Sequence, residues 1–241
     1  MPGFRILSWN ILHGGGSRCE QILESIERFD ADIVALQEFR HGKHGAVLLN
    51  CLNRIGYSEI YAPETDNARQ NTLIIVSRLP MRCDTFPQSG VRNARGITAE
   101  IELTATLTLN MISLHMPQKQ AQIPYFSSLL DLPPQWVGGH SLVIGDLNCG
   151  IPFEDSQTKT FYATHLFQQL LSNGWIDSWR SRNLEAREFS WVSTRKGNGF
   201  RYDHALTSSL VDEVVANVGY DHTVRDNKIS DHSSLMLELE W

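Results

Sequence analysis

Eight short apolar runs rich in β-branched residues recur along the chain, and they constrain its fold more than any other feature. The runs cover residues 4–9, 32–37, 72–76, 97–103, 107–114, 141–144, 201–206 and 233–239, and their length and composition are typical of buried strands. Apolar residues at helical spacing predict helices over residues 17–29, 44–55 and 159–171, with Ser17 able to cap the first. Predicted helices alternate with predicted strands early in the chain, whereas residues 72–114 contain consecutive strands with no helix between them. This mixture favours mixed sheets with helices outside over a pure parallel barrel.

The 241 residues contain no internal repeat, low-complexity tract or linker, so we expect one domain over residues 1–241. A formal net charge of −6, from 21 Lys+Arg and 27 Asp+Glu, argues against a protein that coats nucleic acid through bulk charge. It leaves room for an enzyme with a local basic rim. No run of roughly 18 apolar residues is present, so we expect no membrane insertion, and the first residues do not read as a secretion signal.

The four cysteines, Cys19, Cys51, Cys83 and Cys149, are isolated from one another in the sequence. No C-x-x-C pair is present, which argues against a zinc knuckle or a thioredoxin-type redox motif. Isolated thiols fit a reducing compartment, and we therefore expect a cytoplasmic protein.

The polar residues at the ends of the apolar runs form the most informative functional pattern. Five runs end in, or carry, a residue suited to metal binding or proton transfer, and a sixth is entered from an Asp-His pair. In chain order these residues are Asn10, Glu38, His115, Asp146 with Asn148, Asp203 with His204, and Asp231 with His232. Sites in α/β proteins lie beside strand ends, and the last strand brings its start to the same edge if it runs opposite to the others.

Each of these residues alone has a common structural explanation. Asn10 reads as a turn residue, Glu38 as a solvated helix cap, and Asp146 with Asn148 as an Asx turn. His204 is expected to face the core, because neighbours on a strand point to opposite sides and Asp203 is the better functional candidate. By the same rule Asp231 and His232 must sit in the loop before the last strand if both point inward. The joint occurrence of such residues at separate strand ends favours one shared site.

The ordered motifs S-W-N at residues 8–10, A-L-Q-E at 35–38, S-L-H-x-P at 113–117, I-G-D-L-N at 144–148, G-F-R-Y-D-H at 199–204 and S-D-H-S at 230–233 resemble the endonuclease/exonuclease/phosphatase superfamily. The resemblance implies a four-layer α/β sandwich, in which two mixed β-sheets pack face to face with helices outside. It also implies metal-dependent phosphoester hydrolysis. His115 is similar to the pattern of pancreatic-type deoxyribonuclease and neutral sphingomyelinases, whereas residues 170–180 look like exonuclease III.

The residue types predict which cation such a site would bind. Glu38 and Asp231 are hard oxygen donors and Asn10 is a neutral one, a set that suits Mg²⁺, with Mn²⁺ as a substitute, better than Zn²⁺. We expect Glu38 to be the principal ligand, with Asn10 and Asp231 completing or supporting the site. A second metal near Asp146 and Asn148 is an open alternative.

The remaining residues suit the proton transfers and charge neutralisation that phosphoester cleavage requires. We expect His232 to act as general base or to bind the phosphate, with Asp203 fixing its tautomer. Asp146 would orient or deprotonate the attacking water, and Asn148 would donate to a phosphate oxygen. His115 would be a second acid or phosphate donor.

A local basic rim is predicted from Arg40, which follows Glu38 closely, and from Arg95, which precedes the run at residues 97–103. Both are expected to bind substrate phosphates. We therefore expect a Mg²⁺-dependent phosphodiesterase, foremost a nuclease that cleaves DNA. The alternatives are a phosphatase or phosphodiesterase acting on a lipid head group or a small phosphorylated molecule, and a non-catalytic binding module of the same fold. No protein partner is indicated.

Overall fold

The computed structural model describes residues 3–87, 95–158 and 161–241, which form two six-stranded mixed sheets packed face to face. The first sheet has the order β13-β14-β1-β2-β4-β3, with strands at Val215–Asp221, Ser234–Glu240, Gly3–Asn10, Ile33–Phe39, Thr72–Ser77 and Glu59–Tyr61. The second has the order β5-β6-β7-β8-β12-β9, with strands at Met81–Thr85, Gly96–Thr104, Leu107–His115, Ser141–Asp146, Asp203–Thr207 and Ile176–Asp177. A small hairpin-like sheet pairs β10 (Trp191–Val192) with β11 (Gly199–Phe200).

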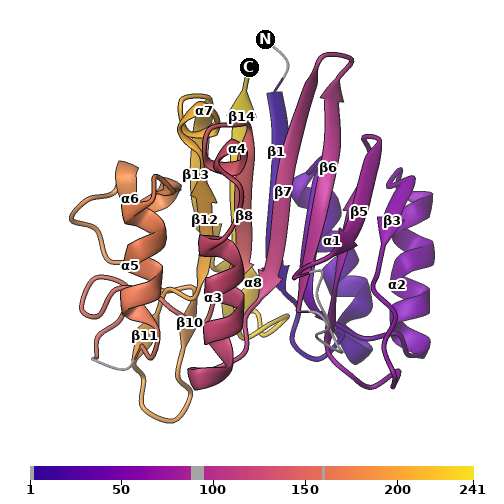
Figure 1. Cartoon of the computed structure of the whole chain (residues 1–241). Helices are drawn as coiled ribbons and strands as arrows, with labels where there is room; N and C mark the ends of the chain where they lie inside the picture. The colour runs from indigo at the N-terminus through magenta and orange to yellow at the C-terminus, as the bar shows by residue number, and fades with distance from the viewer. Residues whose placement is uncertain (1–2, 88–94, 159–160) are drawn as a thin grey trace.

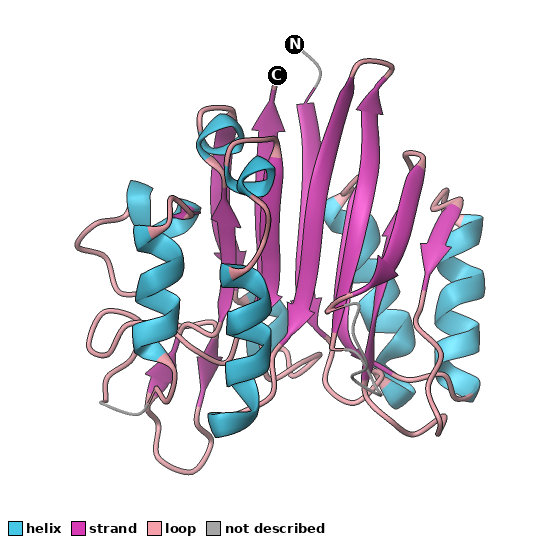
Figure 2. Ribbon diagram, viewed as in Figure 1, coloured by secondary structure: helices cyan, strands magenta, loops and turns pink. Residues whose placement is uncertain are grey.

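Helices cover the outer face of each sheet, so the predicted four-layer α/β sandwich is confirmed (Figure 2). Helices α1 (Cys19–Phe29), α2 (Lys43–Arg54) and α8 (Thr223–Asp226) pack on the first sheet through an apolar cluster that includes Ile22, Leu48 and Val224. Helices α3 (Ile123–Leu130) and α5 (Thr164–Ser172) pack on the second sheet through Phe126 and Phe167. Shorter helices are α4 (Pro134–Val137), α6 (Ser178–Arg182) and α7 (Ser209–Asp212). None of these described helices has the length and apolar character needed to span a bilayer.

A third apolar cluster fills the space between the sheets and is built from both halves of the chain. Ile6, Ile33 and Leu237 of the first sheet lie in one cluster with Met111 and Ile144 of the second, and all five are fully buried or nearly so. Burying apolar side chains on both inner faces stabilises the sheet-on-sheet packing. The strand ends that carry the polar residues are therefore mounted on a rigid core.

The predicted helix starts need two corrections. Ser17 does not cap α1: the helix begins at Cys19, its N-cap residue is Arg18 without a side-chain cap, and Ser17 lies in a 3-10 turn over Gly16–Arg18. The helix predicted over residues 159–171 is observed as Thr164–Ser172, and Lys159 and Thr160 lie outside the described residues. The helix predicted over residues 44–55 is observed at Lys43–Arg54.

Strand directions bring the polar strand ends together. β1 is parallel to β2 and antiparallel to β14, and β7 is parallel to β8 and antiparallel to β6. The last strand therefore runs opposite to β1, as the shared-site prediction requires. Both chain termini lie at one end of the sandwich, and β1 and β7 end at the other (Figure 1).

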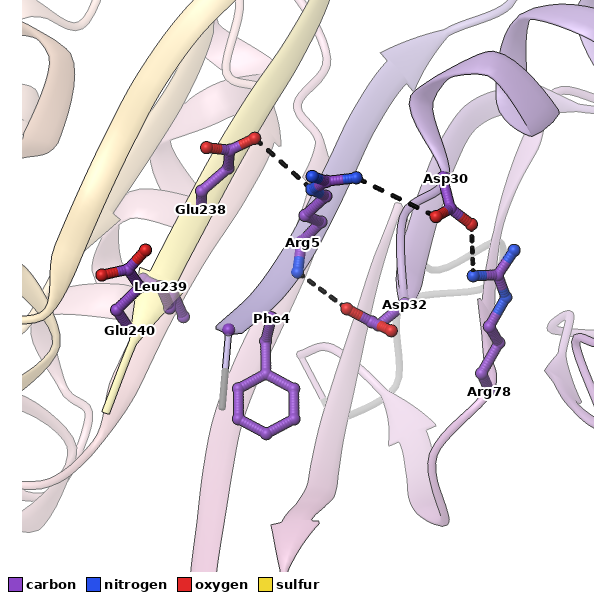
Figure 3. A pocket seen from close by; sticks show the side chains of 9 residues that line it. Phe4, Arg5, Asp30, Asp32, Arg78, Glu238, Leu239 and Glu240 are labelled. Carbon is purple, nitrogen blue, oxygen red and sulfur yellow. Dashed lines mark hydrogen bonds and ion pairs between the residues drawn. The ribbon is translucent and has the colours of Figure 1, made fainter. Parts of the chain in front are cut away.

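A polar pocket of about 300 Å³ lies at the end of the first sheet where β1 begins and β14 ends (Figure 3). Arg5 contacts Asp30 at 3.9 Å and Glu238 at 3.5 Å, and Arg78 contacts Asp30 at 2.7 Å. Asp32 accepts a hydrogen bond from the Arg5 backbone N–H at 2.9 Å. Because these charges already pair with one another, the pocket is a surface ion network rather than a site that awaits a charged ligand.

Candidate active site

Three candidate residues lie side by side on adjacent strands of the second sheet. Asp146 at the end of β8 is paired in register with His115 at the end of β7 and with Asp203 at the start of β12. Residues that are directly paired across strands place their side chains on the same face. Strand register thus assembles three of the predicted site residues without any contribution from loops.

The Asp146 carboxylate is the centre of the site. Its Oδ2 accepts a hydrogen bond from Asn10 Nδ2 at 3.1 Å and lies 3.7 Å from His115 Nε2 and 3.8 Å from His232 Nε2. The side chain is buried, and burial raises the pKa of Asp146 to about 7, against the opposing influence of His232. Asp146 is therefore poised to exchange a proton near neutral pH.

His232 is locked onto Asp203 beside this carboxylate. Its Nδ1 is 2.8 Å from Asp203 Oδ2, which leaves Nε2 directed toward Asp146. Burial alone would lower the pKa of His232, but the charges of Asp203 and Asp146 outweigh it and raise the pKa to about 10. Burial likewise opposes ionisation of Asp203, and His232 outweighs it to hold the pKa of Asp203 below its usual value. The pair is thus an imidazolium hydrogen-bonded to a carboxylate at neutral pH.

Glu38 occupies a bulge rather than a regular strand position. The pairing of β2 with β4 shifts register between Gln37 and Phe39, and Glu38 takes a left-handed φ of 61°. Such strain in a non-glycine residue is typical of functional sites. Burial would raise the pKa of Glu38, but His115, 3.8 Å away, and the His13 backbone N–H, 2.8 Å away, outweigh it and lower the pKa. Glu38 is therefore an ionised carboxylate at the rim.

His115 faces the same centre from the second sheet, and Asn148 reaches it through its backbone N–H, which donates to Asp146 Oδ1 at 3.0 Å. Burial lowers the pKa of His115 to about 4, although Glu38 opposes this effect, so its imidazole is neutral at pH 7. Asn148 has a left-handed φ of 46°, and its Nδ2 donates to Met116 O at 2.9 Å. One residue before Asp146, Gly145 permits the close approach of β8 to β7, because a Cβ there would lie 2.0 Å from Leu114 O.

The three predicted metal ligands are placed differently from one another. Glu38 offers an ionised carboxylate at the site. Asn10 turns its Nδ2 to Asp146, and its Oδ1 accepts the Leu12 backbone N–H at 3.1 Å. Asp231 lies with His232 in the loop before β14; its Oδ2 accepts from Trp191 Nε1 at 3.0 Å, and its buried Oδ1 has no hydrogen-bond partner among the described residues.

A second set of metal-ligand atoms coincides with the catalytic candidates. Asp146, Asp203 and His232 can each offer one ligand atom, and these atoms lie within 4.8 Å of one another. This set contains Asp146 but not Asn148, so it does not test the open alternative of a metal near Asp146 and Asn148, and Asp203 already accepts the His232 hydrogen bond.

Arg40 and Arg95 lie near different residues of the site. Arg40 lines a cavity of about 210 Å³ with His13, Lys43 and Arg69. Arg95 is half-buried beside His115, whose backbone N–H donates to Arg95 O at 2.9 Å. The two predicted phosphate-binding residues are thus next to the site, one near Glu38 and one near His115.

Three residues that support the site were not found from the sequence. Ser230 Oγ donates to Asn10 O and accepts the His232 backbone N–H at 3.2 Å, which joins the loop before β14 to the end of β1. Ser190 Oγ accepts the backbone N–H of Asp203 at 3.2 Å. His13 contacts Glu38 through both its backbone and its ring. Ser230 belongs to the S-D-H-S motif, whereas Ser190 and His13 lie outside the six motifs.

A buried ion network lies next to the candidate site residues Asp203 and His204. Arg201, fully buried, donates to Asp155 at 2.6 and 2.8 Å and to Asp177 at 2.7 and 3.0 Å. His204 also contacts Asp177, at 3.1 Å, and its Nε2 lies 2.9 Å from Cys149 O. His204 therefore faces the core, as expected. The network ties the start of β12 to the segment that follows Asn148.

Replacing Arg201 by methionine is expected to lower the free energy of unfolding by about 3–5 kcal/mol, because two buried carboxylates lose their shared cation. Urea unfolding at pH 7 measures this change. Arg5→Met is the matched control: Arg5 is half-exposed and its ion pairs are long, so we expect a loss within about 1 kcal/mol. Equal losses in the two variants would contradict a structural role for the Arg201 network.

Asp146→Asn is expected to stabilise the metal-free protein at neutral and alkaline pH. The raised pKa means that the fold retains the Asp146 proton between pH 3.8, its ordinary pKa, and about 7. The wild type loses this stabilisation as pH rises through that window, whereas asparagine has no proton to lose. The melting temperature of the variant minus that of the wild type, measured with a chelator, should grow from pH 4 to 7 and then level off. A difference that is independent of pH would refute the raised pKa.

Comparison with known proteins supports one family. The endonuclease/exonuclease/phosphatase family matches residues 7–232 of the chain. Among proteins with curated descriptions, none matches the sequence. Solved structures share the fold at low identity, and the first of three is an AP endonuclease from Archaeoglobus fulgidus, with a TM-score of 0.81, 18% identity, and coverage of 99% of this chain and 100% of that one.

The second similar structure is the 3′ phosphatase NExo from Neisseria bound to a product DNA hairpin. It has a TM-score of 0.81 and 20% identity, and the match covers 99% of this chain and 100% of that one. The third is the AP endonuclease LMAP from Leishmania major, with a TM-score of 0.78 and 16% identity, and the match covers 99% of this chain and 88% of that one. The family match over nearly the whole chain agrees with the resemblance of the six motifs. The chain therefore belongs to the endonuclease/exonuclease/phosphatase family, whose reaction is the hydrolysis of phosphoester bonds.

Proposed function

We propose that this protein is a divalent-metal-dependent nuclease that cleaves phosphodiester bonds in DNA. The observation that carries the proposal is the Asp146 carboxylate, which Asn10, His115 and His232 approach within 3.1 to 3.8 Å. A phosphodiester repels nucleophiles, so its cleavage needs an activated water and neutralisation of the charge that develops on the phosphoryl oxygens. The site combines a carboxylate whose pKa is near 7 with a fixed imidazolium, which supplies both functions.

The geometry supports distinct roles for the two central residues. Asp146 is the better general base, because an efficient base has a pKa near the operating pH. His232, held charged by Asp203, donates from Nε2 to a phosphoryl oxygen rather than accepting a proton. The sequence left two roles open for His232, and its charged state favours phosphate binding over base catalysis. His115 and Asn148 would orient the phosphate as neutral donors.

Glu38 at the rim and Asp231 in the loop before β14 each offer a carboxylate oxygen to a divalent cation. Glu38 is ionised and its side chain is only 14% exposed, and the buried Oδ1 of Asp231 has no partner among the described residues. These hard oxygens suit Mg²⁺ or Mn²⁺. A cation bound there would neutralise phosphate charge and acidify a coordinated water. Asn10 has its oxygen engaged by Leu12, so we assign it to positioning Asp146.

Local positive charge supports a polyanionic substrate. Arg40, Lys43 and Arg69 line one cavity beside Glu38, although the net charge of the chain is −6. The Neisseria structure with the same fold holds a DNA hairpin. The four cysteines are free thiols, which supports the cytoplasm as the compartment of this activity.

Arg40→Ala and Arg95→Ala are each expected to weaken DNA binding independently of sequence and to reduce the salt dependence by about one released ion. Fluorescence anisotropy with a labelled duplex, at several KCl concentrations, measures both effects. Arg5→Ala, at the far end of the sheet, is the control and should leave the slope unchanged. A steep salt dependence that survives both site substitutions would place the DNA-binding surface elsewhere.

A parallel hydrolysis assay tests the proposed function. The purified protein, with Mg²⁺, with Mn²⁺ or with chelator, is given an abasic-site duplex, intact plasmid, a phosphoinositide and a chromogenic phosphodiester. Metal-dependent cleavage of either DNA substrate supports the proposal. Turnover of the phosphoinositide alone would assign the site to lipid head groups, and no turnover of any substrate would favour a non-catalytic binding module.

A further inference from the structure

Gln122 is a buried polar side chain to which the proposed roles assign nothing. It ends a 3-10 helix over Lys119–Gln122, which lies between the strand that carries His115 and helix α3, and only 1% of the residue is exposed. Its Nε2 donates to Leu147 O at 3.2 Å and to Asn148 O at 2.8 Å. A side chain this buried does not touch substrate, so its effect on the reaction passes through these two carbonyl groups.

The orientation of the Gln122 amide follows from its neighbours. Carbonyl oxygens only accept hydrogen bonds, so the NH₂ group of the amide must face them, and each of its hydrogens serves one carbonyl. The buried Oε1 is left without a hydrogen-bond partner among the described residues. An unpaired buried acceptor destabilises a fold. The two donated hydrogen bonds offset this loss, so the side chain serves the turn at Leu147 and Asn148.

The turn that Gln122 holds carries two groups of the candidate site. Asn148 has a left-handed φ of 46°, a conformation that asparagine adopts more readily than most residues but that is still unfavourable. Its backbone N–H donates to Asp146 Oδ1 at 3.0 Å, and its side-chain Nδ2 donates to Met116 O at 2.9 Å. Because Nδ2 carries two hydrogens, the second can donate to a phosphoryl oxygen. The conformation of Asn148 therefore determines where this donor lies.

We propose that Gln122 is a positioning residue that holds Asn148 in its left-handed conformation and thereby fixes the Asn148 side-chain amide beside the scissile phosphate. The neighbouring Leu147 is also held through its own N–H, which donates to Tyr202 O at 2.8 Å. Among the described residues, by contrast, Gln122 is the one donor to Asn148 O. The inference rests on the proposed function and specifies what keeps the segment after β8 in its active form.

Gln122→Met tests this role, because methionine has a similar length and has no hydrogen-bond donor. Turnover of the substrate cleaved in the hydrolysis assay, at saturating metal, should fall about 10- to 100-fold, the effect of a misplaced catalytic group. KM should change by less than about threefold, because the Asn148 amide stabilises charge that develops in the transition state. Gln122→Asn has an amide that is one methylene too short to reach both carbonyls. It should give the same pattern and replaces Gln122→Met if that variant folds poorly.

A double-variant cycle separates positioning from a general loss of stability. Asn148→Gly accepts the positive φ and removes the amide side chain. If Gln122 acts through this amide, adding Gln122→Met to Asn148→Gly should lower turnover by less than about a further twofold. The control is Asn183→Leu, which removes an amide that donates to Trp179 O at 2.8 Å at the end of α6, outside the candidate site. It should lower the melting temperature but leave turnover within about twofold.

Wild-type turnover in Gln122→Met would overturn the assignment, and so would losses that multiply in the double variant. Hydrogen exchange of the Asn148 backbone N–H distinguishes this failure from that of the proposed function, because it requires no substrate. In Gln122→Met this amide should exchange about 10-fold faster or more, with no change at Met111 in the centre of the second sheet. If the wild type cleaves no substrate, the proposed function is wrong, and unchanged exchange at Asn148 would refute the positioning role separately.

Discussion

His232→Ala is expected to lower the turnover of phosphodiester cleavage by about 10²–10⁴-fold, and Asp203→Asn by a similar factor. The alanine removes the imidazolium beside Asp146, and the asparagine removes the charge that keeps the imidazole protonated and oriented at 2.8 Å. The double variant should lose little more than either single variant, because the two residues act as one unit. Steady-state kinetics at saturating metal, with the chromogenic phosphodiester, gives the three values.

The control for these variants is His140→Asn, which changes a histidine at the opposite end of β8, next to Trp241. It should leave turnover within about twofold, since His140 is half-buried at the far end of β8 from Asp146. Losses that multiply in the double variant would mean that Asp203 and His232 contribute separately. Such a result would also weaken the assignment of Asp203 as the group that fixes the His232 tautomer.

The interior strands were predictable from the sequence because their physical signal is strong. All eight apolar runs correspond to observed strands, with shifts of one or two residues at their ends. The strands missed in the two large sheets are β3, β5, β9 and β13, which are their four edges. An edge strand is covered less completely, so it can carry polar residues such as those in Met81–Thr85 and loses the apolar signature of a buried strand.

The candidate site was predictable in membership but not in geometry. The sequence predicts that Asp146, Asp203 and His232 meet, and the structure brings them together through register and the antiparallel last strand. The sequence does not predict the bulge that turns Glu38 into the site, because the bulge depends on pairing with the neighbouring strand. Nor does it predict the amide orientation of Asn10, which depends on the contact with Asp146. The contact of His13 with Glu38 likewise depends on loop dihedral angles that Gly14 and its neighbours permit but do not specify.

Glu38→Gln is expected to reduce metal-dependent turnover by about 10²–10³-fold or more, the loss typical of removing one electrostatic stabiliser from an active site. Glutamine keeps the size of the side chain and can still accept the His13 backbone hydrogen bond, so the fold should persist. It lacks the negative charge that binds a divalent cation. Calorimetry with Mn²⁺ should show weaker binding in parallel with the loss of turnover.

The matched control is Glu238→Gln, which removes the same charge from the same sheet at its far end, where Glu238 contacts Arg5 at 3.5 Å. Because that contact is largely exposed, stability should change by less than about 1 kcal/mol, and neither turnover nor Mn²⁺ affinity should move. Both variants lose one negative charge, so a difference between them reflects the position of the carboxylate and not the net charge of the chain. Equal Mn²⁺ affinities for Glu38→Gln and Glu238→Gln would show that the cation binds elsewhere, and the spacing of Asp146, Asp203 and His232 would then make that set the next site to test.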